Sequence, residues 1–230
     1  GTFFVFSDYL KAALRLSALQ NLPVTYVFTH DSIAVGEDGP THEPIEHLAS
    51  LRTIPNTYVF RPADATEAQA AWYLSQKVNN KPTSLVLTRQ NLPVLENTSF
   101  EKVSKGAYVV YETSSDFDTI LIATGSEVAL AVDVARELEK EGSKVRVVSM
   151  PSVELFEEQS KEYKEELLPR SVRRRVSLEM GNTALWYKYV GLDGLAIGID
   201  NFGASAPANK VIEEYGFTVA KVVERIKNEL

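Results

Sequence analysis

The sequence predicts an α/β protein built from two parallel-sheet units that follow one another along the chain. Short runs rich in β-branched and aromatic residues, typical of buried strands, alternate with stretches at helical spacing. A polar stretch at 91–104, which contains Pro93 and lacks clear periodicity, separates two such series and is interpreted as a linker. The length of 230 residues is enough to bury the core of one large or two ordinary domains.

The first segment carries three aromatic residues, Phe3, Phe6 and Tyr9, which recur every third residue and lead into a helical pattern. Ser7 and Asp8 stand where helix caps are expected. An aromatic stripe at this spacing favours packing into a core. The alternative is the flat wall of a pocket, because aromatic faces stack on planar rings.

The stretch Thr29–Glu46 concentrates residues that carry chemistry and contains two of the three histidines. The alternating apolar run at 24–28 that precedes it predicts a strand. Residues 36–40 include two glycines and a proline, which indicate a turning loop. Thr41 is expected to cap a helix whose apolar positions are Ile45, Leu48, Ala49 and Leu51.

This organisation places His30 and Asp31 where a strand ends, Asp38 on the loop and His42 at a helix start. Ligands bind at that edge of an open α/β sheet, so the spacing favours a small-molecule site. Two alternatives stay open. Such loops are often polar simply because they meet water, and His and Asp are ordinary metal ligands. The long spacing between His30 and His42 disfavours a metal, and His47 is given no role.

The remaining elements continue the same alternation. Asp64-x-x-Glu67 is a capping-box pattern that opens a helix. The turn Thr124–Ser126 could hold phosphate at a helix N-terminus, but a lone glycine turn favours a plain strand-to-helix connection. The predicted strands are 57–60, 83–88, 119–123, 144–149, 175–179 and 195–199, and the predicted helices are 67–78, 128–140, 154–168 and 219–230.

Arg89 follows the predicted strand 83–88 directly. Strand–helix–strand order indicates parallel strands, so Arg89 and His30 are expected to leave the sheet at the same edge. An arginine and a histidine together prefer an anion, and a phosphate suits the guanidinium fork. An ordinary salt bridge is the alternative for Arg89.

Composition narrows the class of protein. The net charge of −7 argues against a nucleic-acid partner, which usually needs a basic face. The run Arg170–Arg175 is the local exception and is interpreted as a solvated helix-to-strand turn. The absence of cysteine removes disulfides and permits an intracellular site, and no apolar stretch approaches the roughly 20 residues that span a bilayer. Because the chain opens at Gly1 on a pattern internal to a domain, we expect a fragment.

A series of short motifs runs over the whole chain in order. They are T-F-F-V-F-S-D-Y, F-T-H-D-S-I-A-V-G-E-D-G-P-T-H-E-P, L-T-R-Q-N-L, A-T-G-S-E-V, V-S-M-P-S, W-Y-K-Y-V-G, F-G-A-S-A-P-A and Y-G-F-T. Together they resemble the transketolase family. D-G-P-T-H alone is shared with related thiamine enzymes, whereas the T-H-D-S-I lead-in and the carboxyl-terminal motifs favour transketolase.

The resemblance implies the second half of a pyrimidine-binding domain with its linker at 1–104, then a Rossmann-like α/β C-terminal domain at 105–230. It implies an enzyme that uses thiamine diphosphate with Mg²⁺ or Ca²⁺ and moves a two-carbon ketol unit from a ketose phosphate to an aldose phosphate. The cofactor would carry out the carbanion chemistry. A cytoplasmic homodimer of the pentose phosphate pathway is the expected whole enzyme.

The resemblance also implies roles for individual residues. Phe3, Phe6 and Tyr9 match the aromatic pocket that holds the aminopyrimidine ring of the cofactor, with Phe6 as the closest stacking partner. His30 and Arg89 match ligands of the substrate phosphate.

Two further matches concern the reacting end of the substrate. Asp38 matches the residue that reads a substrate hydroxyl, and His42 matches a histidine near the reacting carbonyl that donates a hydrogen bond or moves a proton. The family's cofactor-activating glutamate, within R-E-F-G, would lie upstream of Gly1. The metal motif G-D-G is absent as well, so no metal ligand is assigned in this chain. The chain alone is therefore predicted to be inactive.

Two alternatives accompany this interpretation. The chain could be a non-catalytic assembly or binding subunit of a split transketolase, although such a subunit is expected to carry R-E-F-G. It could also belong to a related ketol-transfer enzyme, such as dihydroxyacetone synthase or deoxyxylulose-phosphate synthase.

Overall fold

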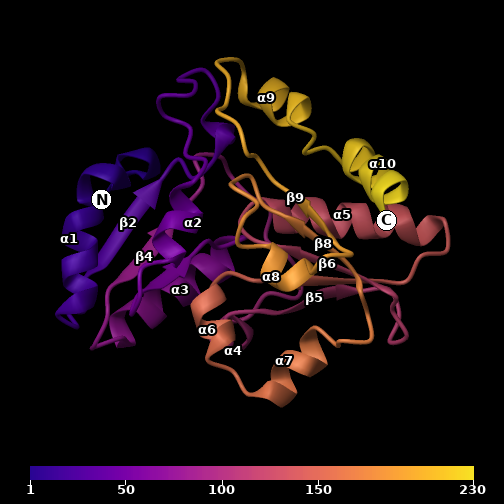
Figure 1. The fold of residues 1–230 in the computed structure, drawn as a ribbon, viewed down its shortest axis with the longest axis horizontal. Coiled ribbons are helices and arrows are strands. Elements are labelled where there is room, and N and C mark those ends of the chain that lie inside the picture. The colour runs from indigo at the N-terminus through magenta and orange to yellow at the C-terminus, as the bar shows by residue number, and fades with distance from the viewer.

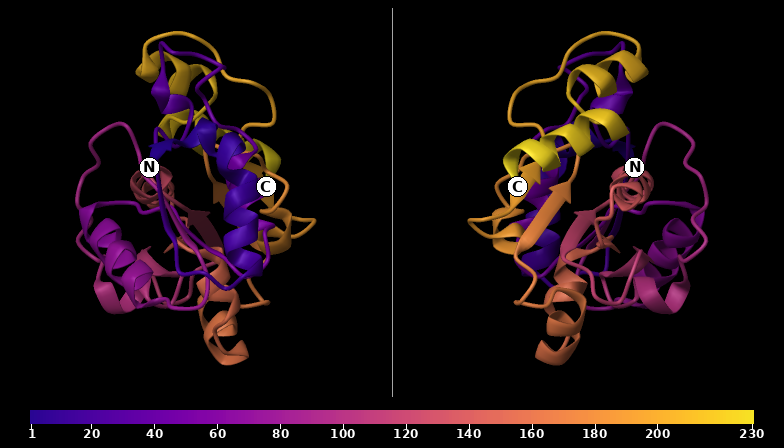
Figure 2. Two further views of the ribbon diagram at one scale, coloured as in Figure 1. Left: turned by 90° about the vertical axis from the view of Figure 1, so that its left-hand side faces the viewer. Right: turned by 90° about the vertical axis from the view of Figure 1, so that its right-hand side faces the viewer.

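The computed structural model describes residues 1–230 and contains two β-sheets that lie side by side with helices around them (Figure 1). The N-terminus belongs to the unit of the first sheet, and the C-terminus to the unit of the second. Both views of Figure 2 show the loop after β2 beside the C-terminal helices at one end of the molecule. None of the helices combines the length and the apolar character that crossing a membrane requires.

The first sheet has four parallel strands in the order β1-β2-β4-β3. Strands β3 and β4 are buried along their whole length, as expected for parallel strands covered on both faces. The strands are β1 (Thr2–Phe3), β2 (Thr25–Thr29), β3 (Tyr58–Phe60) and β4 (Thr83–Val86), and the helices are η1 (Phe4–Phe6), α1 (Ser7–Leu19), η2 (Ile33–Val35), α2 (His47–Arg52) and α3 (Ala65–Lys77).

The second sheet has five strands in the order β5-β7-β6-β8-β9, and only β5 runs antiparallel to its neighbour. The strands are β5 (Tyr108–Glu112), β6 (Thr119–Ala123), β7 (Val145–Ser149), β8 (Arg174–Leu178) and β9 (Leu195–Ile197). The helices are α4 (Phe100–Val103), α5 (Glu127–Lys140), α6 (Val153–Glu157), α7 (Lys161–Leu167), α8 (Tyr187–Val190), α9 (Ala208–Glu214) and α10 (Val219–Glu229).

The two units share one hydrophobic core. A cluster of 33 buried residues includes Phe60 and Leu85 from the first sheet together with Leu121 and Val147 from the second. A separate cluster of 7 buried residues, centred on Phe4, packs α1 and α2 against the outer face of the first sheet. Burial of this kind dominates the stability of such folds, so the units support each other.

The predicted α/β class is confirmed, and most predicted elements are present with ends that differ by a few residues. The capping prediction at the start of α3 is confirmed, because the Asp64 carboxylate accepts from the Glu67 N–H at 2.8 Å. The Glu67 carboxylate reaches back one residue further than a capping box requires and accepts from the Ala63 N–H at 2.7 Å.

Two helix predictions are wrong. The predicted helix 154–168 is two helices, α6 and α7, because the Ser160 side chain caps α7 by accepting from the Tyr163 N–H at 3.2 Å. Thr41 caps no helix, since α2 begins only at His47. Pro44 explains the delay, because the residue before a proline is pushed away from the helical conformation.

The core interpretation of the aromatic stripe is also wrong. Phe3 lies in β1 and Phe6 in η1, both half-buried, while Tyr9 on α1 is 86% exposed. The buried ring is Phe4 instead. The stripe therefore breaks because β1 pairs with β2 before the helix can begin.

Several short elements carried no signal strong enough to be predicted, among them β1, β5, α4, α8 and α9. The segment 91–104, interpreted as a linker, contains α4 and is fastened to the start of α3. The Asp64 carboxylate accepts from the Leu95 N–H at 2.9 Å and from the Thr98 hydroxyl at 2.7 Å. The division of the chain at residue 104 stays a prediction.

Candidate functional site

The candidate site lies where β2 and β4 end. The strands are parallel and in register, with Phe28 opposite Val86, and the Leu87 N–H continues the ladder to the Phe28 carbonyl at 2.8 Å. His30 follows β2 directly, and Arg89 lies three residues beyond the end of β4. The structure therefore brings these two residues to the same sheet edge, where ligands bind in open α/β folds.

His30 is held in a strained conformation. Its φ of 63° lies in the left-handed region, which residues other than glycine rarely adopt. The ring stacks on Phe3 with centroids 3.7 Å apart and planes 24° apart, and Nδ1 lies 3.0 Å from the Thr29 hydroxyl. Stacking and hydrogen bonding fix the ring with Nε2 as its remaining polar atom.

An aromatic row continues from His30 along the start of the chain. Phe3 and Phe6 are stacked at 6.2 Å, Phe6 and Tyr9 lie 6.1 Å apart, and Phe6 meets the His42 ring edge-on at 5.5 Å. The row thus connects both histidines of the loop. Because the rings are only half-buried or exposed, a wall of aromatic faces remains available to a planar ligand.

The predicted polar residues act on one another electrostatically. Burial lowers the pKa of His30, and the positive charge of Arg89 lowers it further. The carboxylates of Asp38 and Asp31 oppose this shift, and His42 adds a smaller lowering effect. His30 is therefore mainly neutral at pH 7. The charges of Asp38, His42 and Arg89 all act on the His30 ring, so the structure brings the four predicted residues within electrostatic reach of one another.

Arg89 forms no ion pair, so the ordinary salt bridge considered for it is not present. Its side chain is exposed at the strand end, and the neighbouring Gln90 has a buried Oε1 without a hydrogen-bond partner. An exposed, unpaired guanidinium beside a neutral imidazole is suited to an anion that arrives from outside.

The loop that carries Asp38 and His42 is supported by the C-terminal unit. The Ser205 hydroxyl donates to the Glu37 carbonyl at 2.6 Å. Gly36 has a φ of 82°, and a Cβ there would lie 3.0 Å from the Ala208 nitrogen at the start of α9. Asp38 itself is exposed, while the half-buried His42 places Nδ1 2.8 Å from the Thr41 hydroxyl.

Glu43 is a buried acid in this loop that sequence reasoning missed. It is 2% exposed, packs against Gly203, and neither carboxylate oxygen has a hydrogen-bond partner. Burial raises its pKa to about 7, and the nearby N–H groups of Ala204 and Gly36 only partly offset that rise. Its place within D-G-P-T-H-E-P was the only available signal.

Two family models match successive parts of this chain. Residues 1–94 match the family model described as the transketolase pyrimidine-binding domain, and residues 106–218 match the transketolase-like C-terminal domain. The chain belongs to the transketolase family. The fold and family expected from the motifs are thereby confirmed.

Individual relatives agree. The chain is 70% identical over 228 residues to a probable transketolase of Streptococcus pneumoniae and 59% identical over 231 residues to the transketolase of Bacillus subtilis, covering 99% of this chain in each case. It covers 35% of each relative, so it spans about a third of their length.

Solved structures give the same picture. A Pichia stipitis transketolase in complex with sedoheptulose 7-phosphate superimposes with a TM-score of 0.94 at 46% identity, over 100% of this chain and 33% of that one. A split-gene transketolase described as an inactive tetramer has a TM-score of 0.82 at 25% identity, over 100% of this chain and 75% of that one.

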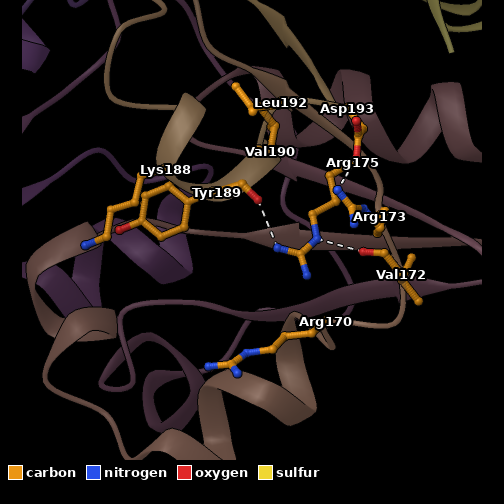
Figure 3. A pocket seen from close by; sticks show the side chains of 10 residues that line it. Arg170, Val172, Arg173, Arg175, Lys188, Tyr189, Val190, Leu192 and Asp193 are labelled. Atoms are coloured by element: carbon orange, nitrogen blue, oxygen red, sulfur yellow. Dashed lines mark hydrogen bonds and ion pairs between the residues drawn. The ribbon is translucent and has the colours of Figure 1, made fainter.

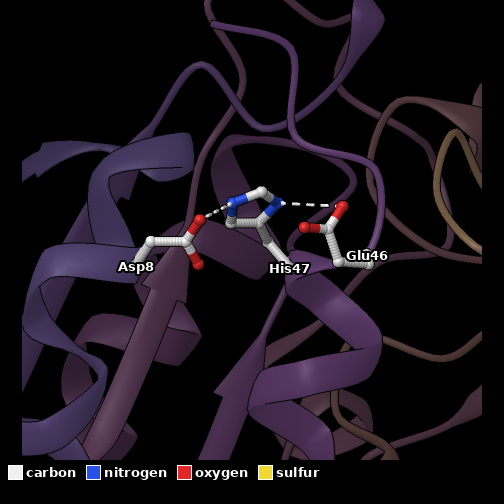
Figure 4. Close-up of side chains that lie close together, drawn as sticks. All are labelled: Asp8, Glu46 and His47. Atoms are coloured by element: carbon white, nitrogen blue, oxygen red, sulfur yellow. Dashed lines mark hydrogen bonds and ion pairs between the residues drawn. The ribbon is translucent and has the colours of Figure 1, made fainter. Parts of the chain in front are cut away.

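The third histidine, His47, lies near the aromatic wall of this transketolase pyrimidine-binding domain. Figure 4 shows its ring between Asp8 and Glu46. Nε2 lies 3.2 Å from an Asp8 oxygen, and Nδ1 lies 3.8 Å from a Glu46 oxygen. The two carboxylates thus face opposite ring nitrogens, which cannot both bind one ion. The arrangement suits a bridge between α1 and α2 better than a metal site.

The arginine run of the transketolase-like C-terminal domain is a helix-to-strand turn, as predicted, since α7 ends at Leu167 and β8 begins at Arg174. Figure 3 shows the Arg175 guanidinium between Tyr189 and Val172. It donates to the carbonyls of Val172, Tyr189, Leu168 and Pro169 at 2.9 to 3.1 Å. Arg175 therefore fastens the turn.

Proposed function

We propose that this chain forms the substrate-facing part of a transketolase, which moves a two-carbon ketol unit from a ketose phosphate to an aldose phosphate. The observation that carries the proposal is the meeting of His30, Arg89 and the aromatic row at the ends of β2 and β4. An anion site beside a wall for a planar ring suits a phosphorylated substrate that reacts at a ring-containing cofactor.

In this proposal His30 and Arg89 bind the substrate phosphate. The guanidinium fork of Arg89 supplies paired N–H donors and the positive charge. If the Thr29 hydroxyl donates to Nδ1, the neutral imidazole of His30 carries its proton on Nε2 and donates it to a phosphate oxygen. The low pKa of His30 does not hinder this role, because a neutral ring still donates.

Asp38 and His42 serve the sugar itself. The exposed Asp38 carboxylate accepts a hydrogen bond from a substrate hydroxyl and so selects its stereochemistry. Contact between Nδ1 and the Thr41 hydroxyl leaves Nε2 of His42 to donate to, or take a proton from, an oxygen next to the reacting carbon. His42 is the proposed catalytic residue of this chain.

The aromatic row fits one side of the cofactor. Phe3, Phe6 and Tyr9 would hold the aminopyrimidine ring of thiamine diphosphate by stacking, with Phe6 central because it touches both other rings. Thiamine diphosphate, when bound with Mg²⁺ or Ca²⁺, supplies the carbanion chemistry of the reaction. The diphosphate and the metal are assigned to residues outside this chain, as is the activating glutamate.

The setting of the whole enzyme is part of the same proposal. We propose sugar phosphates as substrates, a homodimer as the assembly, the cytoplasm as the location and the pentose phosphate pathway as the context. The Pichia stipitis relative bound to sedoheptulose 7-phosphate supports the substrate class.

A chimera tests the proposal. This chain replaces the matching part of the Streptococcus pneumoniae relative, to which it is 70% identical. With thiamine diphosphate and magnesium, the chimera is expected to transfer a ketol unit from xylulose 5-phosphate to ribose 5-phosphate, and His42→Ala to lower kcat roughly 10²-fold. A folded chimera that binds the cofactor but shows no transfer would overturn the proposal.

The 230-residue chain by itself is expected to show no turnover in the same assay. Mixing it with a separate chain that supplies the remaining segments of the Streptococcus pneumoniae relative distinguishes a catalytic part from an assembly subunit. Turnover restored by mixing, and lost with His42→Ala, supports the catalytic role.

A further inference from the structure

We propose that the C-terminal unit fixes the pose of His30 through one buried side chain, Arg61, which acts as a positioning residue. The proposal concerns contacts within this chain, and it rests on the proposed function only in treating His30 as a substrate ligand.

Arg61 follows β3 and is fully buried, with 0% exposure. Toward the candidate site, its Nε donates to the Asp31 Oδ2 at 2.9 Å, and a terminal nitrogen lies 2.8 Å from the same oxygen. Toward the second sheet, its other terminal nitrogen donates to the carbonyl and the hydroxyl of Thr124 at 3.0 and 2.9 Å and pairs with Glu127. Arg61 therefore connects both units directly.

The turn Thr124–Ser126 is shaped to receive this guanidinium. Gly125 has a φ of 55°, and a Cβ at that position would lie 2.7 Å from the Arg61 Cζ. The Gly125 N–H also donates to the Arg61 carbonyl at 3.0 Å. The lone glycine of A-T-G-S-E-V thus makes room for an arginine of the same chain, which accounts for the motif without a bound phosphate.

The far side of the turn is anchored as well. The Thr124 hydroxyl donates to Glu179, whose carboxylate accepts two hydrogen bonds from Arg52 at 2.8 and 2.9 Å. Glu127 accepts from the Met180 N–H at 2.8 Å. Buried charges that are paired and hydrogen-bonded tolerate little displacement, because each lost contact leaves a charge unsolvated. The side chain of Arg61 is consequently held in a fixed position.

Arg61 is connected to His30 through its partner Asp31, which is the next residue in the chain after His30. Asp31 is 1% exposed, and its contact with Arg61 fixes the residue directly after His30. A left-handed backbone at a residue other than glycine persists only where its surroundings enforce it. Stacking on Phe3 constrains the ring, and the contact between Asp31 and Arg61 constrains the backbone. Loss of the second constraint is expected to let His30 relax away from Phe3.

The three histidines of the chain provide the readout, since each gives one Cε1–H signal in a ¹H–¹³C spectrum of the 230-residue protein. In Arg61→Lys, the fork is lost while a positive charge remains. We expect the His30 signal to move, as stacking on Phe3 is lost, and its pKa to rise toward the ordinary value of 6.5, as burial is lost. The buried His47 signal is expected to stay in place.

Arg52→Lys is the matched control. Its side chain is 2% exposed and belongs to the same network, but it contacts Glu179 rather than Asp31. Both variants are expected to melt at lower temperature, and only Arg61→Lys to move His30. Equal loss of stability in both variants, with an unchanged His30 signal and titration in Arg61→Lys, would overturn the proposal.

Glu127→Gln serves if Arg61→Lys does not fold. It keeps an oxygen for Arg61 and weakens the anchor from the side away from His30, so a smaller shift of the His30 signal in the same direction is expected. No shift in a folded Glu127→Gln protein counts against the proposal.

In the chimera, Arg61→Lys is expected to raise KM for ribose 5-phosphate roughly tenfold, as for one lost charge-assisted contact, with a smaller change in kcat. An unphosphorylated aldehyde acceptor is expected to show no such rise. If the unmodified chimera lacks ketol transfer, the proposed function fails, while the spectra still decide whether Arg61 positions His30.

Discussion

The rim at the ends of β2 and β4 and the buried contact between the two sheets use the same residue types in opposite ways. At the rim, Arg89 has no acidic partner. In the buried contact, Arg52 and Arg61 are both paired, with Glu179 and with Glu127 and Asp31. Charged side chains that pair within the chain hold the fold together, whereas a charged side chain without a partner at the surface is available to a ligand. The difference separates positions that hold the fold from positions that we propose to serve the site.

The largest expected effect is a loss of stability when one of the buried ion pairs is removed. Arg52→Ala leaves Glu179 as a buried charge without its bidentate partner, which typically costs about 3–5 kcal/mol. Urea denaturation of the variant and the parent protein measures the loss. Arg89→Ala is the control and is expected to stay within about 0.5 kcal/mol of the parent, since it is an exposed surface position. Similar losses of stability in both variants would show that the buried and the exposed arginine contribute equally to the fold.

Gly125→Ala tests how closely the turn fits Arg61. A φ of 55° costs an alanine about 1–2 kcal/mol, and the added Cβ would also displace the guanidinium. Gly142 has a φ of 90° with nothing within 4 Å of an added Cβ, so Gly142→Ala reports the backbone cost alone. The free energy of unfolding is expected to fall clearly further for Gly125→Ala. Equal losses would mean that the turn tolerates the side chain.

At the candidate site, removal of the unpaired Arg89 is expected to change substrate binding and not stability. In the chimera, Arg89→Ala removes a charge-assisted contact worth about 1.5–3 kcal/mol, so KM for ribose 5-phosphate is expected to rise roughly 10- to 100-fold. The melting temperature should not change. An unphosphorylated acceptor is the control, and a parallel rise of its KM would argue against phosphate binding by Arg89.

These two regions also differ in how far the sequence could predict them. His30 and Arg89 were expected at one edge because parallel strands expose equivalent ends, and β2 and β4 carry a strong local signal of β-branched and aromatic residues. The contact between Arg61 and Thr124 has no such signal. It joins residues 63 positions apart whose types are common in loops, and only the packing of one sheet against the other creates it.

Local conflicts explain the remaining errors. Thr41 was a reasonable cap, but Pro44 delays the helix to His47, and the Thr41 hydroxyl contacts the His42 ring instead. The exposed Tyr9 looked like part of a core stripe, because periodicity does not reveal that two residues at the start of the chain pair as a strand. Both errors fall in segments that form the candidate site.

Glu43 provides the smallest and most specific test, because it is a buried acid on the loop of the candidate site and its carboxylate oxygens have no hydrogen-bond partner. Its pKa is about 7 in the folded protein against 4.5 for a free glutamate, so the folded state keeps a proton that the unfolded state releases. The stabilising contribution is therefore complete below about pH 4.5 and is lost as the pH rises through 7.

Glu43→Gln keeps the shape of the side chain without the charge. At pH 5 the melting temperatures of the variant and the parent protein should be nearly equal, and at pH 8 the variant should melt higher, because the parent must then bury a carboxylate against Gly203. A difference of the same size at both pH values would show that the acid is not protonated in the folded state. Glu43 would then be a buried charge without a hydrogen-bond partner, next to His42 in the sequence.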